Sequence, residues 1–362
     1  MRFVAATVVV IMAYAQVSFS ESLSETPSVK LAANNTTPTE APREALNSVA
    51  RGSASSSTNT ITWVKNDAPP FYIIDEQIID KQINGKQVRE KQCHRGFGDQ
   101  LQDTIERKLN NYRHQTIKVP LSRLEATWSQ YTPLCFATMI HEPPVNNEYI
   151  VSRPNALYLP HGIITRKDHA DRIPRNEDGT LSLTALLSNP GNHRMGQIAG
   201  RTYGETIDTI LAAHSDNLSI SERAGSTETA GILQMLSKHR FDFIIEYEFV
   251  LNHHIDQGDF VNELVFIPIA ETRGQYVLGA IGCSASDSGR QAINAINSVL
   301  PELVTSREYR RAVADWLVPA EDEVFYWQNF DNVQTHQLGK DTPLLKIHDM
   351  TTEPAGNNPH QP

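Results

Sequence analysis

The chain has 362 residues and a formal net charge of −10 at pH 7. Lysine and arginine residues are not clustered in it, and because phosphate binding needs a concentrated basic surface, the composition argues against a nucleic-acid-binding role. The three cysteines permit one disulfide and leave one thiol over, while no CxxC or Cys/His spacing indicates a metal site.

The first residues have the pattern of a signal peptide. Arg2 precedes an apolar run over residues 3–12, and Ala13-Tyr14-Ala15 offers the small residues that a signal peptidase recognises. We therefore expect residues 1–20 to be cleaved and the mature protein to be periplasmic or secreted. The alternative is an uncleaved membrane anchor, with the apolar region continuing to Phe19.

Two segments are predicted to lie outside the folded part. Residues 21–59 are rich in Ser, Thr, Asn, Ala and Pro and nearly lack aromatic residues, which is typical of a disordered linker. Residues 336–362 resemble them and are expected to form a flexible tail. The length between these segments, about 280 residues, favours two lobes rather than one.

The first half of the folded part has the order strand, helix, strand. A strand over residues 61–64 leads through a turn at residues 67–70 into a β-prone stretch at residues 71–74, and a polar loop around Gly85 follows. A helix begins near Gly96 with Leu101, Ile105 and Leu109 on one face. Further strands are expected over residues 116–121 and 133–140. This order predicts a parallel α/β layer, because the crossover helix must pack on the sheet.

The second half repeats this pattern. Strands are expected over residues 161–166, 194–199, 241–249 and 275–283, and helices over residues 230–238, 288–300 and 306–317. Residues 200–205 contain two glycines and suit a strand-to-helix turn with exposed backbone N–H groups. The last strand and helix look like first-lobe elements, so two connecting strands are expected to join the lobes.

The order of these motifs resembles the bacterial extracellular solute-binding proteins of the amino-acid type (family 3), over roughly residues 61–316. Each motif is weak alone, and their order carries the resemblance. The residues concerned are Pro69-Pro70-Phe71, Gly96-Phe97-Gly98-Asp99, Tyr149-Ile150-Val151-Ser152-Arg153-Pro154, Gly200-Arg201-Thr202-Tyr203-Gly204-Glu205, His239-Arg240-Phe241-Asp242-Phe243, and Gly282-Cys283-Ser284 with Gly289-Arg290 and Ile293-Asn294.

The resemblance implies a type II periplasmic-binding fold. This is an α/β architecture of two lobes, each a mostly parallel central sheet flanked by helices, joined by two hinge strands and closing on a ligand. Lobe 1 is expected over residues 60–158 plus 278–335, and lobe 2 over residues 159–277. The resemblance also implies that Cys135 and Cys283 lie on neighbouring antiparallel strands and form the disulfide, the alternative being two buried thiols; Cys93 stays unassigned.

The cleft between the lobes is the expected ligand site. From lobe 1, the candidate ligand-binding residues are Asn66, Asp67, Phe71 and Tyr72, because an aromatic ring can stack on a ligand while a carboxylate fixes a donor. The alternatives are an Asx turn at Asp67 and a core position for Phe71.

From lobe 2, Thr202 and Tyr203 either offer N–H and O–H groups to an anion or simply cap a helix. Glu246 ends an apolar strand, and its carboxylate needs either a ligand ammonium or an internal Arg or Lys. Asp242, at the start of that strand, is interpreted as structural. The adjacent His253 and His254 point in different directions, which argues against a metal site.

One residue that the resemblance implies is missing. Many members of the family bind an amino-acid carboxylate through an arginine that would stand near Val145 here, and no arginine is present there. A guanidinium is the natural bidentate partner of a carboxylate, so ordinary α-amino-acid binding is disfavoured. Arg153 and Arg201 are candidate substitutes, although neither has the expected position.

The resulting hypothesis is an exported, monomeric solute-binding protein without cofactor or metal. It binds a small polar metabolite, amino-acid-like or related, and presents it to an inner-membrane transporter or sensor. The missing arginine keeps a second hypothesis open, a ligand-less scaffold on the same fold. An enzyme is less favoured, because the chain has neither a Gly-x-Ser-x-Gly nor a His-Glu-x-x-His motif.

Overall fold

The computed structural model describes residues 59–74, 76–83, 86–93, 95–142, 147–189, 193–260, 262–319 and 322–336. The chain divides into two units, Met1–Ser55 and Ser56–Pro362, and every described residue belongs to the second. The predicted signal peptide, the linker up to residue 58 and the tail from residue 337 therefore lie outside the described residues.

One sheet is built from both ends of the folded part. Its strand order is β4-β1-β5-β13-β6, with β7 also paired to β13. The pairs β1–β4 and β1–β5 are parallel, whereas β13 runs antiparallel to its neighbours. The strands are β1 (Thr60–Lys65), β4 (Arg113–Lys118), β5 (Leu134–Ile140), β6 (Tyr149–Val151), β7 (Ala156–Tyr158) and β13 (Val277–Ser284).

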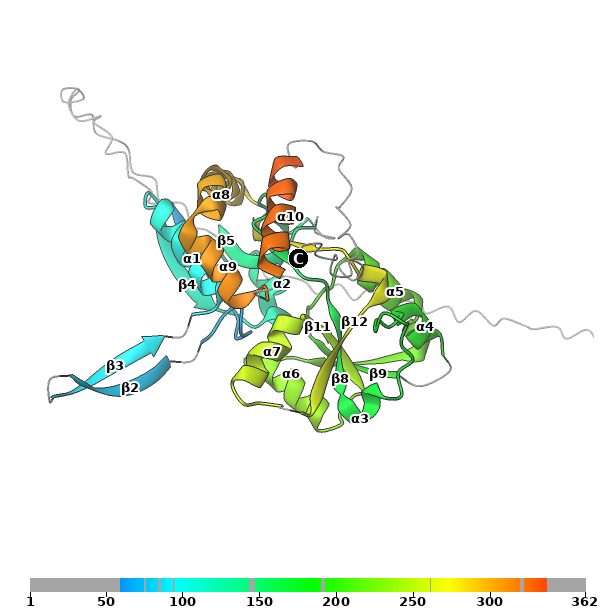
Figure 1. Cartoon of the computed structure of the whole chain (residues 1–362). Helices are drawn as coiled ribbons and strands as arrows, with labels where there is room; N and C mark the ends of the chain where they lie inside the picture. The colour runs from blue at the N-terminus through cyan, green and yellow to red at the C-terminus, as the bar shows by residue number, and fades with distance from the viewer. Residues whose placement is uncertain are drawn as a thin grey trace, which may run out of the picture. The chain divides into compact units, whose positions relative to one another are not determined.

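Helices from distant parts of the chain share one apolar core with this sheet. Figure 1 shows them grouped beside it: α1 (Phe97–Lys108), α8 (Asp287–Thr305), α9 (Arg307–Trp316) and α10 (Glu323–His336). Ile105 of α1 and Ile296 of α8 are fully buried, as the predicted helical spacing requires. A short 3₁₀ turn, η1 (Leu121–Arg123), and the one-turn α2 (Leu124–Thr127) follow β4.

The second sheet has the order β10-β9-β11-β8-β12 and separates two apolar cores. Ile163 and Ile245 belong to the core on one face, and Ile164 and Ile244 to the core on the other, because successive strand residues point to opposite faces. Its strands are β8 (Gly162–Arg166), β9 (His193–Ile198), β10 (Leu218–Arg223), β11 (Phe243–Glu246) and β12 (Leu264–Pro268). Its helices are α3 (Lys167–Ala170), α4 (Leu183–Ser188), α5 (Glu205–Ala213), α6 (Glu228–Ser237) and α7 (Glu248–Asp256).

The chain passes between the sheets twice, once between β7 and β8 and once between β12 and β13. The second passage contains the short turn η3 (Ala270–Thr272). Two α/β sheets flanked by helices and joined by two passages confirm the predicted fold class. β4, β1 and β5 also form the parallel layer that the strand, helix, strand order predicted.

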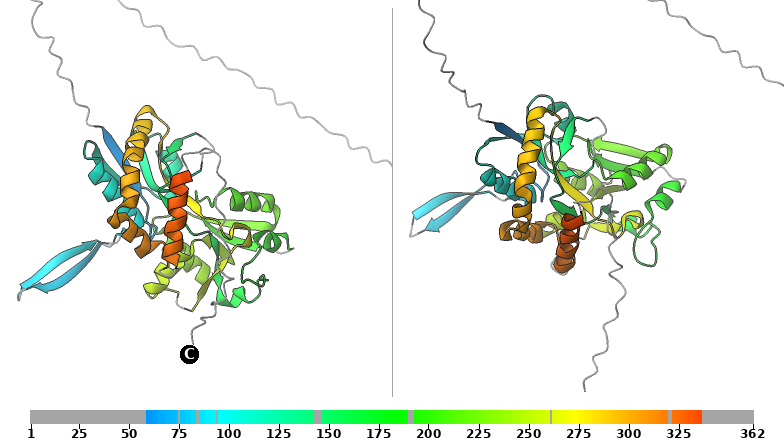
Figure 2. Two further views of the ribbon diagram at one scale, coloured as in Figure 1. Left: turned by 45° about the horizontal axis from the view of Figure 1, so that its top comes forward. Right: turned by 90° about the horizontal axis from the view of Figure 1, so that it is seen from above.

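Some predicted elements were wrong. Residues 71–74 are not a strand, because Ala68 O accepts hydrogen bonds from the N–H groups of Phe71 and Tyr72 and closes a tight turn there. The segment expected as a polar loop instead contains two paired strands, β2 (Glu76–Ile83) and β3 (Lys86–Cys93), which project from the rest of the described unit in both views of Figure 2.

Other elements have different ends from those predicted. β4 stops at Lys118 rather than at residue 121, because Pro120 has no N–H group to donate to a sheet. β11 stops at Glu246 rather than at residue 249, since α7 begins at Glu248; an apolar run by itself does not separate a strand from the helix that follows it. α10 was not predicted, yet Tyr326 and Phe330 anchor it in the first core.

The disulfide is confirmed. Cys135 of β5 and Cys283 of β13 are direct cross-strand partners, both fully buried, and their Cα atoms are 4.1 Å apart. The bond closes a loop spanning 148 positions of sequence, and that loop contains the whole second sheet. It therefore restricts the unfolded chain strongly.

Replacing both cysteines by alanine is expected to lower the free energy of unfolding by about 2–5 kcal/mol. Urea titration followed by circular dichroism measures the change. Dithiothreitol should destabilise the wild-type protein by a similar amount and leave the double variant unchanged. Equal stability of the wild type and the double variant in the absence of dithiothreitol would contradict this prediction.

Candidate functional site

A cleft of about 370 Å³ lies between the two sheets and draws its walls from both. Aromatic rings make up much of the wall, and they come from the turn after β1, from the residue after α2, from β5, β6 and β7, and from the residue after β11. These rings are Phe71, Trp128, Phe136, Tyr149, Tyr158 and Tyr247. Such a mainly apolar, partly enclosed space with a few polar groups is typical of a small-molecule site.

The turn after β1 reaches the cleft because it rests on the start of α1. The N–H of Phe97 donates to Pro70 O at 2.9 Å, and the N–H of Gly98 donates to Phe71 O at 2.7 Å. A Cβ atom at Gly96 would overlap the carbonyl oxygen of Pro70, so glycine is required for this close approach. The helix start predicted from the two glycines therefore also positions Phe71.

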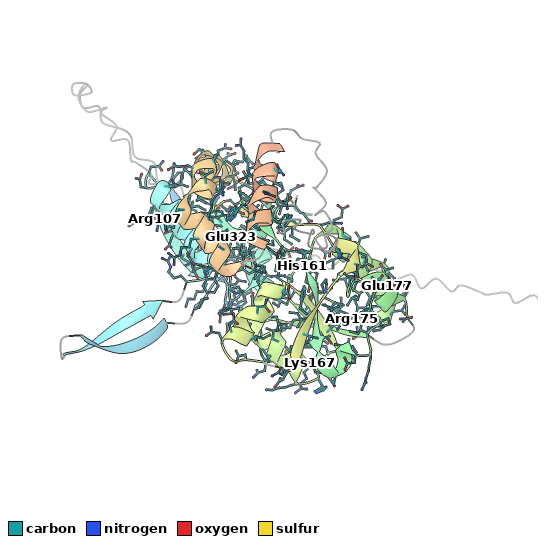
Figure 3. The ribbon with its side chains drawn as sticks, in the orientation of Figure 1. Arg107, His161, Lys167, Arg175, Glu177 and Glu323 are labelled. Carbon is teal, nitrogen blue, oxygen red and sulfur yellow. A yellow bond between two sulfur atoms is a disulfide. The ribbon has the colours of Figure 1, made fainter. Side chains whose placement is uncertain are left out.

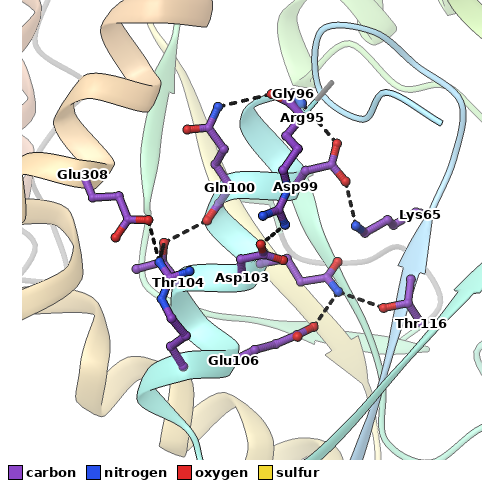
Figure 4. A network of polar contacts seen from close by, with 12 residues as sticks. Lys65, Arg95, Gly96, Asp99, Gln100, Asp103, Thr104, Glu106, Thr116 and Glu308 are labelled. Carbon is purple, nitrogen blue, oxygen red and sulfur yellow. Dashed lines mark hydrogen bonds and ion pairs between the residues drawn. The ribbon is translucent and has the colours of Figure 1, made fainter. Parts of the chain in front are cut away.

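Asp99 ties the same turn to the helix from the side (Figure 4). Its carboxylate accepts hydrogen bonds from the backbone N–H groups of Ile73 and Gly96, both at 3.1 Å, and from Lys65 Nζ at 2.6 Å. Asp99 is buried, and three donors satisfy its charge. The segment between β1 and β2 is thereby held in one conformation beside the cleft.

Glu228, at the start of α6, connects the two lobes across the cleft. Its carboxylate accepts from Asn66 Nδ2 at 2.7 Å and from the backbone N–H of Leu121 at 2.6 Å, and its own N–H donates to Asp67 O at 2.9 Å. Burial raises the pKa of Glu228, and the hydrogen bonds from Leu121 and Asn66 oppose that shift. Beside it, Thr229 Oγ1 donates to Pro69 O at 3.3 Å.

The cleft-facing cation, Arg201, is already paired inside the second lobe. Its Nη2 donates to Glu246 Oε1 at 2.6 Å, and its guanidinium lies 5.4 Å from the centre of the Tyr247 ring. Burial raises the pKa of Glu246, and the positive charge of Arg201 opposes the rise. Of the two alternatives for Glu246, the structure shows the internal arginine pair.

The N-terminus of α5 faces the cleft and is capped by the protein itself. Glu142, in the loop after β5, accepts a hydrogen bond from the N–H of Glu205 at 3.2 Å. Asp208 accepts from the N–H groups of Tyr203 and Gly204 at distances of 3.1 to 3.2 Å. Burial raises the pKa of Asp208, while the N–H groups of Tyr203 and Gly204 lower it. The backbone donors that would attract an anionic ligand are thus occupied by two carboxylates.

The predicted site residues fall into two groups. Four of them line the cleft, namely Asn66, Phe71, Arg201 and Thr202. Five do not line it, namely Asp67, Tyr72, Arg153, Tyr203 and Glu246. Tyr72 is buried and stacks on Phe136 with ring centres 5.8 Å apart, while Glu246 lies behind Arg201.

Arg153 does not substitute for the missing arginine. Its side chain is exposed outside the cleft, and its backbone N–H donates to Asn297 Oδ1 at 2.8 Å. Tyr203 is buried, packs in the second lobe and makes an edge contact with His161. Asp67 is half-buried and contributes its carbonyl oxygen to the Glu228 contact. Val145, where the expected arginine would stand, lies outside the described residues.

Sequence analysis missed several cleft residues. Trp128, Tyr149, Tyr158 and Tyr247 were not proposed, although aromatic residues next to strand ends are a usable signal when the topology is known. The carboxylates Glu142 and Glu148 were also missed, and they flank the loop between β5 and β6. Asp242 pairs with Arg194 at 2.7 Å, in agreement with its structural interpretation.

Several polar groups at or near the cleft have no hydrogen-bond partner among the described residues. They include Asn66 Oδ1, the Tyr158 hydroxyl, Arg201 Nε and both ring nitrogens of His161. Figure 3 shows His161 where the two groups of elements meet, and its ring stacks on Tyr247 at 3.9 Å. Burial, followed by the charge of Arg201, holds the pKa of His161 well below its ordinary value.

The part of the chain that the structure describes contains neither a metal-ligand cluster nor a membrane-spanning helix. No group of three metal-ligating side chains occurs in it. His253 and His254 lie on α7 rather than on a strand or turn, and His254 contacts Asp259 and Thr229. None of the described helices combines the length and the apolar character needed to cross a bilayer.

No protein-family model matches the sequence, and neither does any curated protein. Solved structures do match. A putative L-cystine ABC transporter protein from Listeria monocytogenes superposes with a TM-score of 0.52 and 13% identity, covering 71% of this chain and 94% of that one. An ancestral arginine-binding protein bound to arginine superposes with a TM-score of 0.50 and 16% identity, covering 72% of this chain and 99% of that chain.

A third solved structure concerns glutathione import through GshT and the cystine importer of Streptococcus mutans. It gives a TM-score of 0.50 and 15% identity, covering 73% of this chain and 98% of that chain. These matches confirm the predicted resemblance at the level of the fold, which is that of amino-acid ABC-transporter substrate-binding proteins. At such low identity they carry no ligand or residue role over to this chain.

The unpaired histidine leads to a prediction about stability. His161→Phe keeps a ring against Tyr247 and removes two unsatisfied nitrogens, so the free energy of unfolding at pH 7 should rise by about 1 kcal/mol. The pKa of His161 is lower in the folded protein than in the unfolded chain, where it is near 6.5, so below that pH the unfolded chain binds more protons. The wild type therefore loses stability as the pH falls from about 6.5 toward the folded-state pKa. The wild type should therefore lose up to about 1.4 kcal/mol per pH unit relative to the variant below pH 6.5.

Urea unfolding at pH 7 and pH 5 measures this difference. Tyr158→Phe is the matched control, because it also removes an unpaired buried group but one that does not titrate in this range. It should change stability equally at both pH values. Parallel pH dependence of the wild type and His161→Phe would show that His161 does not carry the effect.

Proposed function

We propose that this protein is an exported, monomeric solute-binding protein that takes up a small polar metabolite in the cleft between its lobes. It presents that metabolite to an inner-membrane transporter or sensor. The observation that carries the proposal is the aromatic-lined cleft of about 370 Å³ between two sheets that are joined by two chain passages. A ligand that contacts both walls would favour the closed arrangement of the lobes.

Solved relatives of the fold support a binding role. Among the structures reported above, one is named an arginine-binding protein and two concern import of cystine or glutathione. The proposed ligand contacts in this chain are Asn66, Phe71 and Thr202, together with the rings of Trp128 and Tyr149. Trp128 and Tyr149 stack on each other at 5.5 Å and form one broad aromatic wall.

A ligand-less scaffold is the second candidate, and the contacts between the lobes favour it. Glu228 and Thr229 hold the turn after β1, and Glu142 holds the start of α5, all through groups of the protein itself. Lobes closed by such bonds do not need a ligand to stay together. The two functions differ in whether any metabolite binds the cleft.

A thermal-shift screen with a metabolite panel tests the proposal. Amino acids, amines, peptides, organic acids and sugars are each added, and a ligand present at a hundred times its Kd should stabilise the folded protein by about 2.7 kcal/mol. We expect at least one compound to raise the Tm by several degrees. Calorimetry then gives its Kd.

Two tyrosine variants show whether a compound binds in the cleft. Tyr149→Leu removes a ring from the wall and should weaken binding at least about tenfold, since aromatic pairs and contacts contribute on the order of 1 kcal/mol or more. Tyr131→Leu, at an exposed tyrosine of the same lobe outside the cleft, should leave binding unchanged. A folded protein that responds to nothing in the panel would favour the scaffold.

A further inference from the structure

We propose that the ligand of this cleft is an organic amine, protonated at neutral pH and without a carboxylate group. The inference rests on the proposed binding function and specifies its ligand class. Four properties of the cleft carry it: its charge, the state of its single guanidinium, an acceptor without a donor, and its aromatic wall.

The charged side chains that line the cleft are mostly acidic. Four carboxylates line it, from Glu125, Glu142, Glu148 and Asp208, against one guanidinium, from Arg201. Burial raises the pKa of Tyr149, and the nearby negative charges of Glu142 and Glu148 raise it further. A cation entering this space is attracted, and an anion is repelled.

The one guanidinium does not offset this potential for a ligand. Arg201 is bonded to Glu246 at 2.6 Å, and its Nε is buried, with no partner among the described residues. Glu246, whose own side chain is almost fully buried, already balances the charge of Arg201. The pair is therefore close to neutral and attracts a ligand carboxylate less than an unpaired guanidinium would.

The helix N-terminus that could hold an anion is also occupied. The first N–H of α5 donates to Glu142, and the N–H groups just before it donate to Asp208. An anionic ligand group would compete with two carboxylates that are already in place. The helix start and Arg201 are thus both paired with internal carboxylates, which disfavours the carboxylate of an α-amino acid.

Asn66 indicates what the ligand must donate. Its Nδ2 donates to Glu228, which fixes the orientation of the amide and leaves Oδ1 as an acceptor. Oδ1 is buried on a residue that lines the cleft and has no donor among the described residues. Tyr158, also lining the cleft and 1% exposed, has an unpartnered hydroxyl that can accept as well. A small movement of the wall toward an ammonium N–H would satisfy these acceptors.

The aromatic wall suits the body of such a ligand. The stacked rings of Trp128 and Tyr149 border Glu148, so a cation held by the carboxylate lies near π faces. Phe71 and Phe136 supply apolar surface for an alkyl or aryl chain. The cleft therefore combines carboxylates for the charge, acceptors for the N–H groups and rings for the carbon skeleton.

Matched pairs of compounds test the inference by isothermal titration calorimetry. Agmatine is compared with arginine, and tyramine with tyrosine, because the members of each pair differ by one carboxylate. We expect the amine to bind at least about tenfold more tightly than its amino acid in every pair that binds. An amino acid that binds as tightly as its amine, or binding by organic acids or sugars in place of amines, overturns the inference and leaves the proposed function intact.

A charge-removing variant identifies the site. Glu148→Gln keeps the shape of the side chain and should weaken amine binding by about tenfold. The control is Glu177→Gln, at an exposed residue of the second lobe that Figure 3 shows away from the meeting point of the sheets. Equal amine affinity of Glu148→Gln and wild type overturns the assignment, while silence of the complete metabolite panel overturns the proposed function as well.

Discussion

The buried carboxylate of Glu228 is the interaction on which the cleft depends. It reaches from the second lobe to the side-chain amide of Asn66, just after β1, and to the backbone N–H of Leu121, after β4. A buried charge of this kind is stable only when donors surround it, so removing either donor costs more than one hydrogen bond normally contributes. The same contact orients Asn66 and brings α6 beside the turn after β1. Closure of the lobes and shape of the cleft are therefore set together.

Electrostatics inside the cleft follow from how each charge is paired. Arg201 is matched by Glu246 behind it, and the start of α5 is matched by Glu142 and Asp208. These pairings place carboxylates beside Arg201 and the start of α5 before any ligand arrives. The carboxylate of Glu148 adds negative charge on the opposite wall, beside stacked aromatic rings. The fold is that of amino-acid-binding proteins, whereas the charge distribution differs from what a zwitterion with an exposed carboxylate needs.

The elements were predicted well where neighbouring residues alone determine them. The helical spacing of Leu101 and Ile105 predicted α1. The structure adds that Gly96, at the start of this helix, permits the close approach of Pro70. The partner of Glu246 was left open, because Arg201 precedes it by 45 positions and meets it only after two strands pair in the second sheet. Tyr247 was placed inside a strand and so missed as a cleft residue, since an apolar run does not show where β11 gives way to α7. Contacts between distant segments, not local propensity, decide those positions.

The missing arginine near position 145 and the capped start of α5 both weaken the binding of a ligand carboxylate. In a cleft that binds a carboxylate, guanidinium and helix N–H groups must stay available, and any internal acid nearby would weaken the ligand's hold. Here the internal acids Glu142 and Asp208 accept hydrogen bonds from the helix start, so these N–H groups are already paired before a ligand carboxylate could reach them. Without that arginine, the carboxylates that line the cleft favour a cationic ligand over an anionic one. The unfilled acceptor on Asn66 lies in the same cleft, so charge and hydrogen bonding select for the same kind of ligand.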